Sequence, residues 1–129
     1  MVKEHIKQDM PAAFRVAVRT LDAWDYSDGE MARVLGLSPE QFQRYRATGL
    51  PEESMNDDLT TRVSLVLGIE RALEILLAEE SDIRNWVNDP SKATLFEGST
   101  PKTIMVNGQL GDLRKIRTYL DGWLQGDFS

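Results

Sequence analysis

Residues 81–126 read SDIRNWVNDPSKATLFEGSTPKTIMVNGQLGDLRKIRTYLDGWLQG, and this stretch decides the fold of the chain. Its first part predicts a short helix through Trp86 that ends before Pro90, because a residue preceding proline is pushed out of the helical conformation. Thr100 and Pro101 predict the start of a second helix. Threonine accepts bonds from free N–H groups at a helix start, and proline is tolerated at the first helical position.

A third helix is predicted over about residues 109–125, between two glycine signals. Asn107-Gly108 ends the preceding helix in a left-handed conformation, and Gly126 closes the last one. Apolar residues share one face of this helix at three- and four-residue spacing: Leu113, Ile116, Leu120, Trp123 and Leu124. The stretch therefore predicts a bundle of short helices, and the fold class that we expect is all-α.

Residues 28–47 match the pattern of a helix-turn-helix. Ala32 is small enough for a helix crossing, and Gly36 falls four residues later, in the turn. Serine followed three residues later by Glu or Gln forms a capping box, and this pattern occurs at Ser27 and again at Ser38. The apolar positions that would pack the two helices together are Met31, Leu35, Leu37, Phe42 and Tyr45. A first helix is predicted to begin at Pro11.

A long helix is predicted over about residues 58–79, with Asn56 or Asp57 as its cap. Its apolar stripe is broad, which indicates a core helix, and part of the stripe is a candidate dimer contact. Gly68 interrupts the helix at a cost of about 1 kcal/mol relative to alanine. Either a close helix approach or simple tolerance would explain this glycine, and we favour tolerance.

Several features after Leu59 resemble the toxin-binding domain of the Xre/MbcA/ParS-type antitoxins. These features are the Trp86-x-Asn88-x-Pro90 helix end, the turn Leu95…Gly98…Thr100-Pro101, and the basic helix over residues 113–120. The resemblance implies an antitoxin that binds and silences a RES-domain toxin, an enzyme that degrades NAD. It also implies repression of the pair's own operon through an N-terminal DNA-binding domain.

Three segments are predicted on this basis. Residues 1–10 would be a flexible leader, residues 11–49 a helix-turn-helix domain, and residues 57–126 a helical toxin-binding domain. The two helical parts would form separate lobes, and the protein would act as a homodimer.

If the second helix of the helix-turn-helix lies in a major groove, its outward residues meet the bases. Arg44 would bind guanine and Gln43 adenine through paired bonds. Ser38 and free N–H groups at the helix start would hold a phosphate. The carboxylate of Glu40 weighs against DNA binding, because the phosphate backbone repels it unless it accepts a hydrogen bond from cytosine. The alternative is a fold retained only for packing or dimerisation. The candidate DNA-binding residues are Ser38, Glu40, Gln43, Arg44, Arg46 and Ala47.

The last helix and its tail are the candidate surface for a toxin. The resemblance implies contacts by region, and an aromatic tail that would enter the NAD pocket of the toxin. Without the resemblance, the basic strip of Arg114, Lys115 and Arg117 is a solvated face, and the tail, residues 126–129, is a disordered end. The candidate toxin-binding residues are Arg114, Arg117, Trp123, Leu124 and Phe128.

Composition excludes several other functions. The net charge is −6, with −7 in residues 50–99 and +1 in residues 100–129, so a DNA-binding face remains possible only outside the acidic middle. There is no cysteine, and His5 is the only histidine, so disulfides, histidine triads and multi-histidine metal sites are excluded. No apolar run approaches the ~18 residues of a membrane span.

We therefore expect a cytoplasmic protein that has neither enzymatic activity nor a cofactor. Its partners would be a RES-domain toxin and operator DNA. One alternative is a stand-alone helix-turn-helix regulator whose C-terminal part only dimerises. Another is an antitoxin without DNA-binding activity.

Overall fold

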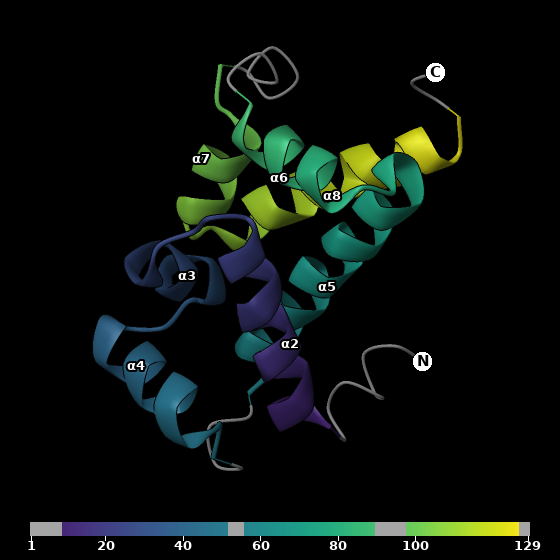
Figure 1. The fold of residues 1–129 in the computed structure, drawn as a ribbon. Coiled ribbons are helices and arrows are strands. Elements are labelled where there is room, and N and C mark those ends of the chain that lie inside the picture. Colours follow the sequence, from purple (N-terminus) through teal and green to yellow (C-terminus); the bar gives the residue numbers. More distant parts are fainter. Residues whose placement is uncertain (1–8, 52–55, 90–97, 127–129) are drawn as a thin grey trace.

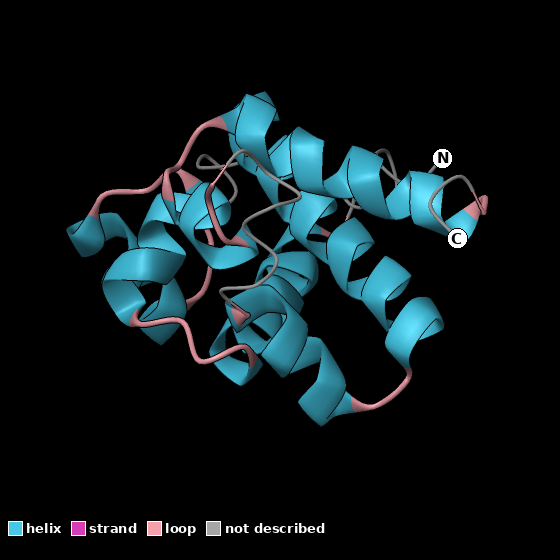
Figure 2. Cartoon of the chain, turned by 90° about the horizontal axis from the view of Figure 1, so that it is seen from above, coloured by secondary structure: helices cyan, strands magenta, loops and turns pink. Residues whose placement is uncertain are grey.

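The computed structural model describes residues 9–51, 56–89 and 98–126. Within these ranges every regular element is a helix, which confirms the all-α prediction (Figure 1). Figure 2, which draws the chain from above, likewise contains helices and loops in its described part. In chain order the helices are α2 (Met10–Ala23), α3 (Asp28–Leu35), α4 (Pro39–Thr48), α5 (Asp57–Leu77), α6 (Glu80–Asn88), α7 (Pro101–Val106) and α8 (Leu110–Leu124).

The long helix α5 is the centre of the arrangement. It packs most extensively against α8 and next against α2. Figure 1 shows α4 at the lower end of the molecule and α6, α7 and α8 at the upper end. The two ends of the molecule are thus connected through α5, which contacts helices of both predicted lobes.

Local capping signals begin the helices where the sequence predicts them. The side chain of Ser27 accepts from the Glu30 N–H, and that of Ser38 accepts from the Gln41 N–H, each with the reciprocal bond of a capping box. Thr100 caps α7 without a reciprocal bond: its hydroxyl oxygen accepts from the Thr103 N–H over 3.1 Å. Since side-chain oxygens replace partners that the first turn lacks, these helix starts are confirmed.

Two helix boundaries differ slightly from expectation. Asn56 caps α5, which therefore begins at Asp57 and ends at Leu77, two residues earlier than expected. Helix α2 begins at Met10 rather than Pro11, and Met10 is fully buried. The described part of the chain thus begins its packed structure inside the predicted leader, while residues 1–8 lie outside the described ranges.

The buried apolar side chains form one cluster that runs from α2 to α8. Phe14 and Phe42 from the first predicted lobe belong to it, and so do Val66, Trp86 and Leu113 from the second. The two predicted lobes therefore share a single hydrophobic core. The expected core position of Trp86 is confirmed, because 5% of this residue is exposed.

The turn between α2 and α3 is the point where α6 and α7 meet the helix-turn-helix. The Asn88 amide of α6 donates to the Trp24 carbonyl over 3.0 Å, and the Tyr26 hydroxyl donates to the Met105 sulfur of α7. Burial raises the pKa of the Tyr26 hydroxyl, so this group stays neutral. Lys102 of α7 lies 3.3 Å from a carboxylate oxygen of Glu30. Asn88, part of the pattern over residues 81–126, thus has a structural role here.

Gly68 has a neighbour from α8 that the sequence does not reveal. A Cβ atom on Gly68 would overlap the guanidinium of Arg117, which crosses from α8 to lie against this point of α5. The missing side chain leaves room for this guanidinium, so Gly68 is in contact with the end of a side chain from α8.

Candidate functional site

The six candidate DNA-binding residues lie on α4 or at its cap, and all six are exposed. The opposite side of α4 carries Phe42 and Tyr45, which are buried. The Tyr45 ring meets the Phe14 ring of α2 edge-on, with centroids 6.4 Å apart. These contacts fix α4 against the bundle and leave its polar side open.

Two of the six residues are held by a carboxylate of the preceding helix. The Gln43 Nε2 atom donates to Asp28 Oδ2 over 2.8 Å, and Arg46 Nη1 donates to Asp28 Oδ1. A second carboxylate, on Asp22 of α2, lies 3.6 Å from Arg46 Nη2. The sequence interpretation missed Asp28, because no local spacing rule connects the first turn of α3 to the middle of α4.

Arg44 differs from Arg46 in its surroundings. Its guanidinium lies over the Tyr45 ring, 5.3 Å from the centroid, and it forms no ion pair with a described residue. Stacking on an aromatic ring orients a guanidinium without neutralising its charge. Among the described residues, no carboxylate pairs with Arg44, whereas two carboxylates hold Arg46.

The predicted phosphate site at the start of α4 is partly occupied by the protein itself. The Ser38 N–H donates to the Gln41 side chain, and the Gln41 N–H donates to the Ser38 hydroxyl oxygen. Pro39 has no N–H to offer. The capping box therefore uses donors that we expected to bind a phosphate, and the Ser38 hydroxyl can still donate its proton.

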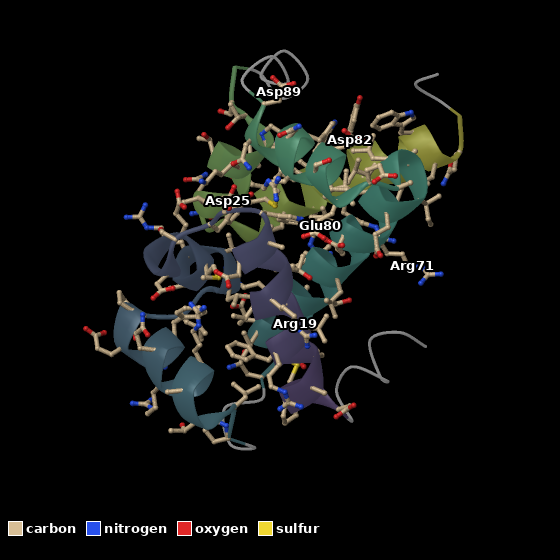
Figure 3. The ribbon with its side chains drawn as sticks, viewed as in Figure 1. Arg19, Asp25, Arg71, Glu80, Asp82 and Asp89 are labelled. Carbon is tan, nitrogen blue, oxygen red and sulfur yellow. The ribbon has the colours of Figure 1, made fainter. Side chains whose placement is uncertain are left out.

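A groove between α2 and α4 adds positive charge beside this surface. Arg15 and Arg19 of α2 and Arg46 of α4 line it, together with the carboxylate of Asp22. Figure 3 shows Arg19 on the outer side of α2. The sequence shows these two arginines on one face of the first helix, but it does not show that this face lies next to α4.

The candidate toxin-binding residues fall on two flanks of α8. Arg114 is exposed, Leu124 is 39% exposed, and Arg117 is half-buried. At 3.6 residues per turn, Arg117 and Leu124 lie on the same side of the helix. Arg117 covers Gly68 of α5 and pairs with Asp121 through bonds of 2.9 and 3.1 Å. This flank faces α5.

Trp123 belongs to the other flank of α8. Its ring lies 6.3 Å from the Tyr119 ring, which in turn stacks on Trp86 of α6 at 6.4 Å. The structure therefore does not bring Trp123 together with Arg114 and Arg117 in one patch. Phe128, the remaining candidate, lies outside the described residues.

A second groove lies between α2, α5 and α6, and it is acidic. Glu70, Glu74 and Glu80 line it together with Arg19. Burial and the neighbouring carboxylates of Glu74 and Glu80 raise the pKa of Glu70, while a hydrogen bond from the Trp24 side chain opposes this shift. Figure 3 shows Arg19 on α2 and Glu80 on α6. In the described ranges no group of three or more His, Asp or Glu side chains could hold a metal ion.

Comparisons with known proteins extend this description only a little. No family model matches the chain. The chain is similar to a protein of Sinorhizobium fredii (strain NBRC 101917 / NGR234) named uncharacterized protein y4oB, with 29% identity over 114 residues. The aligned part covers 87% of this chain and 84% of the relative, whose name states no activity. None of the helices described here is both long and apolar enough to cross a membrane.

Proposed function

We propose that this protein is an antitoxin that binds and neutralises a RES-domain, NAD-degrading toxin and represses its own operon by binding DNA. In this proposal the C-terminal helices bind the toxin, and α4 meets the DNA as part of a homodimer. The observation that carries the proposal is the sequence pattern over residues 81–126, which resembles the toxin-binding domain of the Xre/MbcA/ParS-type antitoxins.

The surroundings of α8 support a protein partner at this end of the molecule. Arg114 and Leu124 are both exposed, so α8 offers a cation near its start and an apolar side chain near its end. Interfaces between proteins commonly combine arginine with apolar anchors. Arg117, held by Asp121, would support this helix rather than provide a free charge.

The surroundings of α4 support a DNA partner at the other end. An exposed polar helix, an Arg44 without an ion pair among the described residues, and a groove lined by three arginines and Asp22 lie side by side, although the chain as a whole carries a charge of −6. Asp22, Asp28 and Glu40 lie among these arginines, but a local excess of arginines attracts phosphates even on an acidic protein.

A stand-alone helix-turn-helix regulator is the second candidate function. The observation that favours it is the internal use of Arg117, which covers Gly68 and pairs with Asp121. In that function the inner side of α8 completes the core. The outer surface of the C-terminal helices then serves only dimerisation. Removing residues 125–129 would then change nothing except solubility.

The proposal predicts that a RES-domain protein is encoded in the same operon as this chain, and the toxin-binding test uses that protein. The rate of NAD consumption by that enzyme is measured at increasing concentrations of the full-length chain. We expect stoichiometric inhibition, and we expect deletion of residues 125–129 to weaken it at least tenfold. Undiminished NAD consumption at a large excess of folded protein would contradict the proposal and favour the stand-alone regulator.

The DNA-binding proposal is tested with two arginine variants that serve as controls for each other. We expect Arg44→Ala to cost roughly 1–3 kcal/mol of specific binding to the promoter of the protein's own operon. Arg114→Ala removes the same charge from α8 and should leave promoter binding unchanged while it weakens toxin inhibition. Equal losses of promoter binding in both variants would indicate unspecific attraction by net charge alone.

A further inference from the structure

The carboxylate of Asp28 connects the two helices of the helix-turn-helix on their exposed side. It accepts from Gln43 Nε2 over 2.8 Å with one oxygen and from Arg46 Nη1 with the other. Gln43 and Arg46 are three residues apart and therefore neighbours on the surface of α4. One side chain of α3 thus restrains two side chains that would otherwise rotate freely.

The restraint determines which end of the Gln43 amide is directed outward. A carboxylate can only accept hydrogen bonds, so the amide nitrogen must face Asp28 and the amide oxygen must point away from it. Gln43 then presents a fixed acceptor and one remaining N–H to a ligand. A base edge with a donor beside an acceptor, such as that of adenine, fits this arrangement.

The same restraint reduces the positive charge that Arg46 offers. Arg46 lies between Asp28 and Asp22, and its guanidinium also lies 5.8 Å from the centre of the Phe42 ring. A phosphate would have to compete with two carboxylates for it. Arg44 has no such competitor among the described residues, so the two arginines of α4 are not equivalent.

We propose that Asp28 is a positioning residue that makes α4 selective for base sequence at the expense of general DNA affinity. This inference rests on the proposed DNA binding. Asp28 orients the Gln43 amide toward a base edge and keeps Arg46 from binding phosphates indiscriminately. Asp28 itself does not contact the bases.

The test uses the full-length protein and duplexes with a randomised central segment, from which the bound sequences are enriched. Affinity is then measured for one enriched duplex and for the random pool over a range of salt concentrations. Asp28→Asn keeps an oxygen that can accept from Gln43 but removes the charge that holds Arg46. Asp28→Ala removes both functions.

The two variants should separate the two effects of Asp28. We expect Asp28→Asn to bind the random pool about threefold more tightly, with a salt dependence that is steeper by about one phosphate contact. Asp28→Ala should show the same steeper salt dependence as Asp28→Asn. In addition, it should lose roughly tenfold of the preference for the enriched duplex over the random pool. In a Gln43→Ala background, Asp28→Ala should cause no further loss of preference.

Asp82→Asn is the matched control. Asp82 is also an exposed acid in the first turn of a helix, and that helix, α6, lies at the opposite end of the molecule from α4 (Figures 1 and 3). Asp82→Asn lowers the negative charge of the protein by the same amount as Asp28→Asn, and it leaves α4 unchanged. Thermal unfolding of all variants verifies that they are folded.

Two negative results have different meanings. If the folded wild-type protein enriches no sequence and does not bind the pool, the proposed DNA binding fails, and the role of Asp28 fails with it. If the wild type enriches a sequence but Asp28→Asn and Asp28→Ala behave like Asp82→Asn, DNA binding stands and the inference about Asp28 is overturned.

Discussion

Two arginines of this protein lie against glycines outside their own helices, and their surroundings differ. Arg62 of α5 lies against Gly36 in the turn between α3 and α4, while Arg117 of α8 lies against Gly68 in the middle of α5. The side chain of Arg62 is 11% exposed and that of Arg117 is 38% exposed. Both pair with an aspartate four residues away in their own helix.

The glycine backbones differ as well. Gly36 has a φ of 71°, a left-handed conformation that costs other residues about 1–2 kcal/mol, whereas Gly68 is an ordinary helical residue. The first contact therefore needs glycine for two independent reasons, and the second needs it only for space. Arg62 also donates to the Val34 carbonyl over 3.2 Å, which ties α5 to the helix-turn-helix.

The largest effect is expected from Gly36→Ala. A Cβ atom at this position would lie 2.7 Å from Arg62 Nε, in addition to the cost of the left-handed backbone. We expect the free energy of unfolding to fall by about 2–4 kcal/mol, measured by urea denaturation. Gly29→Ala in the preceding helix α3 meets no atom within 4 Å and should leave the stability unchanged or slightly higher.

The contact with Arg62 can be separated from the backbone effect by a double-mutant cycle. Arg62→Met keeps a long apolar stem but leaves the Val34 carbonyl without this donor, so we expect a loss of about 1–3 kcal/mol. In the Arg62→Met background, Gly36→Ala should cost only about 1–2 kcal/mol, the left-handed term alone. Strictly additive losses would show that Arg62 does not limit the space at Gly36.

A much smaller effect is expected from Gly68→Ala. Alanine gains about 1 kcal/mol of helix propensity, and the half-exposed end of Arg117 can move aside. We expect a net change of less than about 1 kcal/mol in the free energy of unfolding. A loss as large as that of Gly36→Ala would contradict the distinction between the two contacts. Gly111→Ala on α8, with open space around it, measures the propensity gain alone.

The smallest effect concerns Glu70, which lies two residues after Gly68 and gives the α5 region a pH dependence. Its pKa is raised in the folded state, mainly by burial and next by the neighbouring Glu74. As pH rises from the ordinary pKa of glutamate to the raised value, the unfolded chain has lost this proton and the folded protein still binds it. Stability therefore falls with pH in this window.

Glu70→Gln should remove this pH dependence. Glutamine stays neutral and keeps an oxygen that can accept from Trp24. We expect a slightly higher melting temperature at neutral pH and no difference below the ordinary pKa of glutamate. A lower melting temperature at neutral pH would show that the charge of Glu70 stabilises the fold. The exposed Asp82→Asn variant is the control.

The same two contacts show what the sequence could predict. The turn at Gly36 was predictable, because a capped helix, a glycine and a second capped helix follow one another within a few residues. The role of Gly68 was not, because it depends on a residue 49 positions later in the chain. Close approach of distant segments leaves no local signal in the sequence.

The candidate surfaces follow the same rule. The exposure of all six candidate residues of α4 follows from helical periodicity and was predictable. The ties of Gln43 and Arg46 to Asp28, and the position of Arg15 and Arg19 beside α4, depend on how helices pack. On α8, periodicity gives the buried residues Leu113, Ile116 and Leu120 but not the separate neighbours of Arg117 and Trp123.

The most direct test of the proposed function is a growth measurement. The RES-domain protein that the proposal predicts in the same operon is expressed in cells alone, with the wild-type chain, and with the chain lacking residues 125–129. We predict that the toxin alone arrests growth, that the wild type restores it, and that the shortened chain restores it poorly. Arrest that persists with abundant, folded wild-type protein would contradict the antitoxin proposal.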